Sequence, residues 1–314
     1  MNSSVTSISL SPDNTHAAIS FDHSFHLYSL VSMKRVFQKD SLNYRINKCC
    51  VSEEGNMVAL LSHPIIGIKS VYKVFVWGRL EDDFISELEF KEKIMNISIS
   101  RDLLLVVMLN SICLCDITKG TQHHQIITAD NPFGAGDIAE SHNTMLIAVC
   151  GLQIGTLTVY ECKKDSEPLT FRAHVHSVSA IKFSRDSSII ATAGEKGTLI
   201  RLFDSSTGGL LYVFRRGTLA SRILSLAMAP SNSYLLAISE SGTIHLFDSS
   251  IRKAENSEPQ RAAIKHSVER DQHIIASVML DDKFCMLTSS GHYFIFKKKG
   301  SSLEVESRVF LFAH

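Results

Sequence analysis

The feature that most constrains this chain is an internal repeat with a period of roughly 40–50 residues. Each copy has a short apolar strand, a polar turn, a second apolar strand, a tighter turn that often contains glycine, and a third strand that ends in an aromatic residue or an aspartate. Seven copies follow one another, and their first three strands span residues 5–30, 46–77, 94–117, 136–160, 178–203, 223–247 and 274–296. Such a period is typical of the four-stranded blades of propellers.

A fourth, more polar strand follows most copies, as expected for the solvent-exposed edge of a blade. Examples are residues 34–39, 84–90, 125–128, 169–172 and 211–214. Almost no window has the apolar spacing of a helix of ten or more residues. We therefore predict an all-β, WD40-like fold, a seven-bladed β-propeller formed as a single domain by residues 1–314. Because the copies start and stop in phase with the chain ends, we expect it to close without an exchanged strand.

Two connections differ from the short loops elsewhere. The turn at residues 128–134 contains Asn131-Pro132 and Gly134, which restrict the backbone from both ends. The stretch at residues 249–263 lies inside the sixth copy, between its third strand and its outer strand. We predict a fixed turn in the first case and a longer loop in the second.

The balance of charges excludes a global attraction to nucleic acid or membrane. The chain contains 32 Lys and Arg residues and 32 Asp and Glu residues, so any such attraction must be local. Its seven cysteines follow an N-terminus without a signal-peptide pattern, which favours reduced thiols in the cytosol. The apolar runs are too short to span a bilayer. We expect a cytoplasmic monomer that binds no nucleic acid and contacts membranes peripherally.

Motifs for catalysis and for metal binding are lacking in the sequence. It has no Gly-x-Ser-x-Gly elbow and no phosphate-binding glycine loop. Its cysteines do not form the paired Cys-x-x-Cys couples of a zinc site. Asp204 and Asp248 lie at strand ends, where blade turns commonly place aspartates. We therefore predict that the protein is not an enzyme and holds neither a metal nor a cofactor.

Two adjacent arginines, Arg215 and Arg216, close the apolar strand at residues 210–214 and are followed by Gly217. Neighbouring side chains on a strand point to opposite faces, so the two arginines cannot serve one small site. Near-copies of one phrase lie on either side, at residues 197–204 and 242–248. The arginine pair therefore lies at the junction between two repeats, and each arginine is expected to face a different blade.

Each arginine can gather a group of polar side chains suited to phosphate oxygens. The antiparallel third and fourth strands of a blade place Arg215 beside Gly197-Thr198. Residues that can join this first group are Lys196, Arg201 and His174, and those of the second group are Thr243, His245, Ser239, Ser241 and Arg222. The alternative is that the arginines only form ion pairs with carboxylates such as Glu195 and Glu240.

The sequence around the arginines resembles that of a known family. Phe214-Arg215-Arg216-Gly217 is similar to the Phe/Leu-Arg-Arg-Gly signature of the PROPPINs, the phosphoinositide-binding propellers of autophagy (WIPI-like proteins in animals). Four further segments are similar to family segments: residues 128–134, Ala173-His174, residues 191–201 and residues 242–247. The similarity covers most of the chain and is strongest from about residue 120 onwards.

The resemblance implies two sites for phosphatidylinositol 3-phosphate and its 3,5-bisphosphate in membranes. The first site would contain Arg215, His174, Thr198 and Arg201, and the second Arg216, Ser239, Thr243 and His245. It also implies recruitment of autophagy machinery, with a lipid-transfer protein as partner, and a location on the phagophore assembly site or on endosomal, vacuolar or lysosomal membranes. The rival hypothesis is a WD-repeat scaffold without lipid binding.

Two residue differences separate this sequence from the family pattern. Gly194 replaces a serine of the family, which removes a hydroxyl from the first site. The stretch at residues 249–263 is short and has no aromatic residue, whereas the family's loop is longer and inserts an amphipathic stretch into the bilayer. We expect little insertion from this loop. We also expect the turn at residues 128–134 to bind a protein partner, away from the arginines.

Overall fold

The computed structural model describes residues 5–64, 70–122, 125–141, 144–162, 167–250, 259–267, 274–280, 283–288, 290–300 and 302–311. Apart from the 3₁₀ turn η1 (Glu53–Gly55), every regular element in these ranges is a strand. None of the described residues forms a helix long and apolar enough to cross a membrane.

The strands form seven sheets, which we number as blades one to seven in chain order. Blades one to three contain β1 (Val5–Leu10), β2 (His16–Phe21), β3 (Ser24–Ser29), β4 (Lys34–Lys39); β5 (Ile46–Val51), β6 (Met57–Ser62), β7 (Tyr72–Gly78), β8 (Asp83–Phe90); and β9 (Ile94–Ser100), β10 (Leu103–Met108), β11 (Ser111–Asp116), β12 (Thr121–Gln122), β13 (Ile126–Ile127). These blades belong to one compact unit of the chain.

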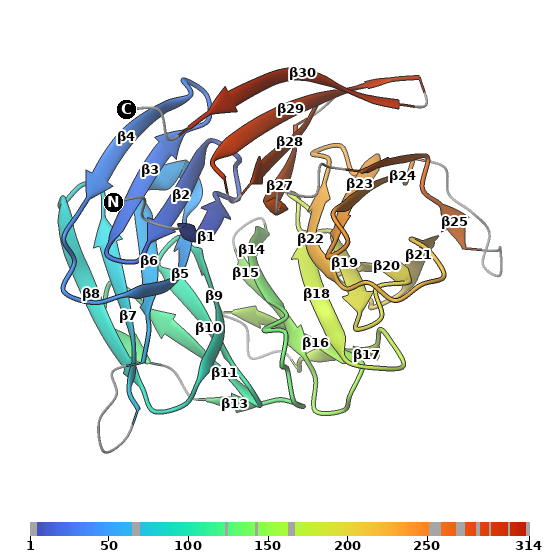
Figure 1. Cartoon of the computed structure of the whole chain (residues 1–314). Coiled ribbons are helices and arrows are strands. Elements are labelled where there is room, and N and C mark those ends of the chain that lie inside the picture. The colour runs from blue at the N-terminus through green and yellow to red at the C-terminus, as the bar shows by residue number, and fades with distance from the viewer. Residues whose placement is uncertain are drawn as a thin grey trace. The chain divides into compact units, whose positions relative to one another are not determined.

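Blades four to seven belong to a second compact unit, except for the ends of β29 and β30. Their strands are β14 (Gly136–Ser141), β15 (Thr144–Cys150), β16 (Thr156–Cys162), β17 (Leu169–Arg172); β18 (Val178–Phe183), β19 (Ile189–Gly194), β20 (Leu199–Asp204), β21 (Leu210–Arg215); β22 (Ile223–Met228), β23 (Tyr234–Ser239), β24 (Thr243–Asp248), β26 (Ile264–Ser267); and β27 (Ile274–Leu280), β28 (Lys283–Thr288), β29 (His292–Lys299), β30 (Ser302–Phe310). A short strand, β25 (Gln260–Arg261), joins the edge of blade five (Figure 1).

The strand order confirms the predicted seven-bladed β-propeller. In each blade four strands pair antiparallel in the order in which they follow along the chain. In addition, β13 pairs with β11 in blade three, and β25 pairs in parallel with β21 in blade five. Among the described strands, β1 pairs with β2 in blade one, and the outer strand of blade seven is β30, so no exchanged strand is present. The outer strand of blade three differs from the prediction for residues 125–128, because two short strands, β12 and β13, pair with β11 instead.

Burial follows the position of each strand in its blade. All six residues of β10, with the sequence LLLVVM, are buried, because the middle strands are covered on both faces. In the edge strand β8 exposed residues alternate with less exposed ones, which is the pattern of a sheet with one face in solvent. The apolar core lies between adjacent blades within each unit; between blades one and two, for example, Trp77 stacks on Phe37 with ring centroids 4.0 Å apart.

Candidate functional site

The arginine pair lies at the end of β21, the outer strand of the regular antiparallel sheet of blade five. Arg215 is opposite Leu199 of β20, and Val213 is opposite Arg201, so Arg215 and Arg201 share one face of the sheet. Phe214 points to the other face, where its ring packs 4.9 Å from that of Phe247 in blade six. Arg215 therefore faces away from blade six, as the alternation of side chains predicted.

Arg216 follows the strand and is held by main-chain carbonyls. Its N–H donates to the carbonyl of Thr198 at 2.9 Å. Its Nε donates to the carbonyl of Gly197 at 2.9 Å, and its Nη2 donates to those of Leu219 at 2.8 Å and Ser221 at 2.9 Å. The two protons on Nη1 have no partner among the described residues, so part of the guanidinium can bind a ligand.

Gly197 makes this arrangement possible. Its φ of +60° is in the left-handed region, and a Cβ at this position would lie 2.1 Å from the carbonyl oxygen of Ser221. Any side chain would therefore clash with the loop that surrounds Arg216. The glycine of the Lys-Gly-Thr phrase is required by this close approach of two backbone segments.

In the first site, His174 and Arg201 contact each other directly. Arg201 Nη1 donates to His174 Nδ1 at 3.0 Å and to the carbonyl of Ala173 at 2.9 Å. Because a guanidinium only donates, Nδ1 accepts and the imidazole proton lies on Nε2. Nε2 then donates to Thr192 Oγ1 at 2.9 Å, and the hydroxyl donates to the carbonyl of Arg201 at 3.4 Å. Every polar atom of the His174 ring is thus satisfied.

Burial of His174, which is only 6% exposed, lowers its pKa to about 3, and the charge of Arg201 adds to this effect. The imidazole is therefore neutral at physiological pH. Thr192 was not among the predicted site residues, although the register Thr192↔Arg201 places it there. The alternation of the strand at residues 191–201 could have indicated it.

Gly194 leaves room for the His174 ring. A Cβ on Gly194 would lie 3.0 Å from His174 Nδ1 and 3.2 Å from its Cγ, closer than an ordinary van der Waals contact. The missing side chain therefore lets the ring approach the backbone of β19. Arg215 and Thr198, the other predicted members of the first site, have no side-chain hydrogen bond to a described residue.

The second site combines hydroxyls with a buried histidine. Ser239 Oγ donates to the carbonyl of Thr243 at 3.1 Å and lies 2.9 Å from Ser241 Oγ, which is itself 3.4 Å from Thr243 Oγ1. These contacts link the end of β23 to the start of β24 around the turn at Gly242, whose φ is +74°. The structure thus brings together the predicted residues Ser239 and Thr243.

His245 is the distinctive residue of the second site. It is 2% exposed, and neither ring nitrogen has a hydrogen-bond partner among the described residues. Burial lowers its pKa to about 4, and the positive charges of Arg216 and Lys265 contribute. Arg216 therefore acts electrostatically on His245, the other charged or titratable member of the predicted second site. A buried polar group without a partner is costly in a native protein, so His245 needs an explanation.

Neither arginine of the pair forms an ion pair with a described carboxylate. Glu240, one of the two proposed partners, is 3.5 Å from Arg222 instead. Glu195 is exposed and pairs with no described side chain. The structure therefore gives no support to the view that carboxylates neutralise Arg215 and Arg216, within the part of the chain that it describes.

The turn at residues 128–134 is fixed, as predicted. Asn131 is 1% exposed; its Nδ2 donates to the carbonyl of Ala135, and its Oδ1 accepts from the Ala135 N–H, both at 2.8 Å. The Phe133 ring of this turn is 5.5 Å from the guanidinium of Arg222, a predicted member of the second group. That the turn binds a partner away from Arg215 and Arg216 stays a prediction. Long-range packing of blade six, which local turn chemistry does not encode, brings these segments together.

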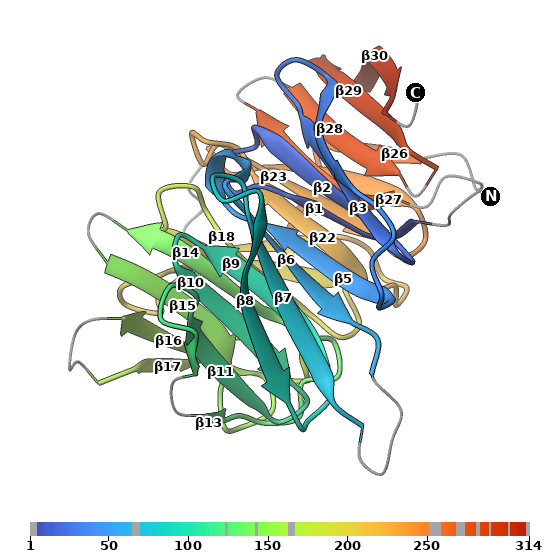
Figure 2. The same cartoon turned by 90° about the vertical axis from the view of Figure 1, so that its left-hand side faces the viewer.

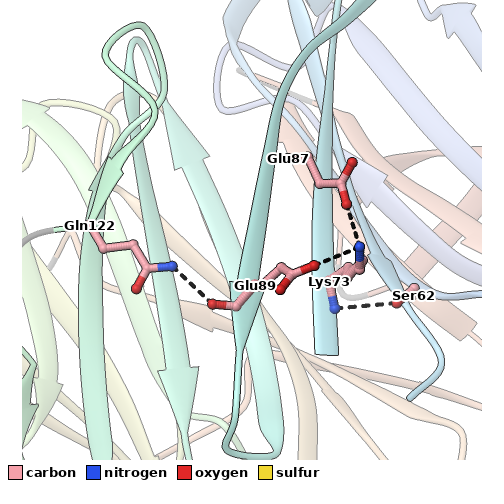
Figure 3. Close-up of polar contacts among 5 residues, drawn as sticks. All are labelled: Ser62, Lys73, Glu87, Glu89 and Gln122. Atoms are coloured by element: carbon pink, nitrogen blue, oxygen red, sulfur yellow. Dashed lines mark hydrogen bonds and ion pairs between the residues drawn. The ribbon is translucent and has the colours of Figure 1, made fainter. Parts of the chain in front are cut away.

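A groove that sequence reasoning missed lies in blades one and two. It has a volume of about 570 Å³ and includes Tyr44, whose ring stacks on Phe75 at 4.0 Å, and Phe84 from β8. The Tyr44 hydroxyl is buried without a described partner. Beside the groove, the ammonium group of Lys73 forms ion pairs with Glu87 and Glu89 of β8 (Figure 3). The main-chain carbonyl of Glu89 accepts a hydrogen bond from Gln122 Nε2 at 3.0 Å. Figure 2 shows β7 and β8 as a long hairpin.

Comparisons with curated proteins show relatives over part of their length. Autophagy-related protein 18e of Arabidopsis thaliana is 30% identical over 175 residues, which are 56% of this chain and 46% of that protein. Autophagy-related protein 18 of Caenorhabditis elegans is 28% identical over 205 residues, which are 64% of this chain and 49% of that protein. The chain thus spans about half the length of these relatives.

Solved structures with the same fold cover nearly the whole chain. Hsv2 of Kluyveromyces lactis, with a complete loop 6CD, has a TM-score of 0.82 at 16% identity and covers 99% of this chain and 100% of its own. A complex of KlAtg21 with the coiled-coil of AgAtg16 has a TM-score of 0.80 at 18% identity, over 98% of this chain and 99% of that chain. The PROPPIN family model matches residues 4–294. This chain therefore belongs to the PROPPIN family.

Proposed function

We propose that the protein is a phosphoinositide effector that binds phosphatidylinositol 3-phosphate and its 3,5-bisphosphate at two sites and recruits autophagy machinery to membranes. PROPPIN is not a family of enzymes, and the proposal includes no catalysis. The observation that carries it is the divergence of Arg215 and Arg216 toward two different histidine clusters, without a described carboxylate to neutralise either guanidinium.

The chemistry of both clusters suits phosphate monoesters. Arginine binds phosphate through a planar fork of N–H donors, and hydroxyls add further donors. The side chain of Arg215 has no described hydrogen-bond partner, and the Nη1 protons of Arg216 have none either. In the second site, the neutral His245 offers one donor and one acceptor to a ligand. Binding there would satisfy a polar group that the protein alone leaves buried and unpaired.

Vesicle co-sedimentation tests this proposal. Vesicles of phosphatidylcholine with and without phosphatidylinositol 3-phosphate are compared, using the wild type and an Arg215→Gln/Arg216→Gln variant. A control, Arg185→Gln/Lys91→Gln, removes the same charge at exposed positions. We expect the wild type and the control to bind only the phosphoinositide vesicles and the arginine variant to bind neither. Equal sedimentation of all three proteins would refute the proposal.

The second candidate function is a protein scaffold without lipid binding, and the groove beside Tyr44 favours it. Aromatic residues are enriched at protein interfaces, and the hydroxyl of Tyr44 in this groove is buried without a described partner. One solved relative is a complex with a coiled coil, which shows a protein partner for that propeller. The vesicle experiment separates the candidates, since a scaffold would not distinguish the two kinds of vesicle.

For the lipid-transfer partner, we propose the turn at residues 128–134 as part of the contact. Asp130 and Pro132 are exposed there, whereas Asn131 supports the turn from inside. Asp130→Lys should reduce capture of that partner in pull-downs and leave vesicle binding intact. Unchanged capture would exclude the turn. The membranes concerned would be the phagophore assembly site and endosomal, vacuolar or lysosomal membranes, which the protein would reach from the cytoplasm as a peripheral monomer.

A further inference from the structure

The stretch that leads from β24 to the outer strand of blade six returns to blade five on its way. Its residues 251–258 lie outside the described part of the chain. Gln260 and Arg261 then form β25, which pairs in parallel with β21 and extends the sheet of blade five beyond the arginine strand (Figure 1). The periodicity of the repeats gave no indication of this pairing.

Contacts on both sides hold β25 in this position. Gln260 Nε2 donates to the carbonyl of Asp248 at 3.0 Å. Ala262 packs against the core between blades five and six, and the N–H of Ala263 donates to the carbonyl of Leu246 at 2.8 Å. The position of β25 is therefore fixed by blade five on one side and blade six on the other.

The register of this pairing places two arginines side by side. Arg261 is directly paired with Arg215, and Phe214 with Gln260. Neighbouring strands lie about 4.8 Å apart, and directly paired residues project from the same face of a sheet. Arg261 is exposed, and neither it nor Arg215 forms an ion pair with a described carboxylate. Adjacent like charges oppose the pairing, and an anion bound between them would remove this cost.

The interior of the first site strengthens the case for a second external arginine. Both Nη1 protons of Arg201 are committed to His174 and to the carbonyl of Ala173. Gly194 supplies no hydroxyl. The Nε and Nη2 donors of Arg201 and the hydroxyl of Thr198 have no described partner, and the guanidinium of Arg215 and that of the arginine paired with it add further donors at this site.

We propose that Arg215 and Arg261 together clamp one phosphate monoester, so that Arg261 is a phosphate-binding residue of the first site. This inference rests on the proposed function and deepens it. Two guanidinium forks on one face can each bind two of the three terminal oxygens of a phosphate monoester and share one of them, and their two positive charges match the charge of the dianion. The stretch after Asp248 would then serve to deliver a ligand-binding side chain.

Calorimetry with two soluble probes, inositol 1,3-bisphosphate and inorganic phosphate, tests the clamp. We expect Arg261→Gln to weaken binding of the bisphosphate at one of its two sites by about tenfold or more, since a charged hydrogen bond contributes about 1.5–3 kcal/mol. In an Arg215→Gln background, the same change should have little further effect. Gln260→Ala, which loosens β25 but keeps the charge of Arg261, should weaken binding too.

The controls separate the clamp from the proposed function. Arg185→Gln removes a charge from an exposed loop of blade five and should leave both affinities unchanged. A loss confined to the bisphosphate supports a lipid headgroup as ligand, and an equal loss with inorganic phosphate supports a clamp for any phosphate. If the wild type binds and Arg261→Gln binds as tightly as Arg185→Gln, the clamp is wrong while the proposed function stands. If the wild type binds no bisphosphate, both fail.

Discussion

The two histidine clusters beside the arginine pair differ in how far the protein satisfies its own polar groups. In the first site, Arg201 and Thr192 bind both nitrogens of His174. In the second site, His245 is buried as well, and its two nitrogens have no described partner. The ring nitrogens of His174 in the first site are both hydrogen-bonded within the protein, whereas those of His245 in the second site lack a described partner.

This difference assigns different roles to the interior of each site. The imidazole of His174 holds Arg201 in place and has no free polar atom to offer a ligand. Burying a polar group without a partner costs about 1–3 kcal/mol of free energy. A ligand that forms hydrogen bonds with the imidazole of His245 would recover this free energy. We therefore expect the second site to use its interior and the first site to bind phosphate at its edge.

The largest effect should come from avidity. If both sites meet lipids in one plane, losing either should reduce vesicle binding by about 10²–10⁴-fold, although soluble-headgroup affinity at the other site stays nearly constant. Calorimetry should give two headgroups per chain for the wild type and one for Arg215→Gln or Arg216→Gln. Vesicle binding should also weaken with added salt, because the contacts are ionic. If calorimetry gives one headgroup per wild-type chain, the hypothesis of two binding sites is wrong.

The two arginines should differ in their effect on stability. Arg216→Gln removes three hydrogen bonds to carbonyls, so the free energy of unfolding should fall by about 2–4 kcal/mol. Arg215→Gln removes none that the structure describes, and we expect a change within about 0.5 kcal/mol. Urea denaturation of both variants measures the difference. Equal stabilities would show that the carbonyl contacts of Arg216 contribute nothing.

Replacing each histidine with phenylalanine should give effects of opposite sign. His174→Phe removes the hydrogen bonds of the ring to Arg201 and to Thr192, each of which keeps only a main-chain carbonyl as partner. The free energy of unfolding should therefore fall by about 2–3 kcal/mol. His245→Phe removes two unpaired nitrogens and should leave stability unchanged or raise it by about 1 kcal/mol. Denaturation without ligand tests this pair, and a large loss for His245→Phe would show that its ring has a partner in solution.

Acidification should destabilise the protein through these histidines. Their pKa values in the folded protein, about 3 for His174 and about 4 for His245, lie below the unfolded value of 6.5. The unfolded chain therefore takes up protons first, and stability falls as the pH drops below 6.5. By linkage, each should cost about 2 kcal/mol by pH 5. The loss should be smaller in His245→Phe by that amount; an unchanged pH profile would contradict its lowered pKa.

A smaller effect than those of Arg216→Gln and His174→Phe should come from Gly194→Ser. The new Cβ would lie 3.0 Å from His174 Nδ1, so the ring must move by a few tenths of an ångström. We expect the free energy of unfolding to fall by about 1 kcal/mol. The new hydroxyl should partly compensate in headgroup binding, where it adds a hydrogen-bond donor. Thermal unfolding and calorimetry of this variant measure both. Gly209→Ser in an exposed turn is the matched control.

Much of the site could be predicted because the relevant signal is local. The alternation of side chains along β21 separates Arg215 from Arg216, and the repeated Gly-Thr phrases place Thr198 and Thr243 at the two junctions. The hydrogen-bond partners could not be predicted in the same way. Arg201 binds the ring of His174, 27 positions earlier, and Arg216 binds the carbonyl of Gly197, 19 positions earlier. Those pairings depend on how blades and loops pack.

The sequence by itself determined the number of blades, the order of their strands and the opposite directions of the two arginines, because strand periodicity repeats every two residues and the blade pattern repeats along the chain. Only the tertiary structure decided that His174 is satisfied and His245 is not, that Arg216 is bound by three carbonyls, and that Arg261 pairs with Arg215. Each of these depends on which groups from distant segments arrive within hydrogen-bond distance. The burial of the apolar faces between blades fixes these distances. The polar groups beside the arginine pair then form hydrogen bonds with whichever partners this packing brings close.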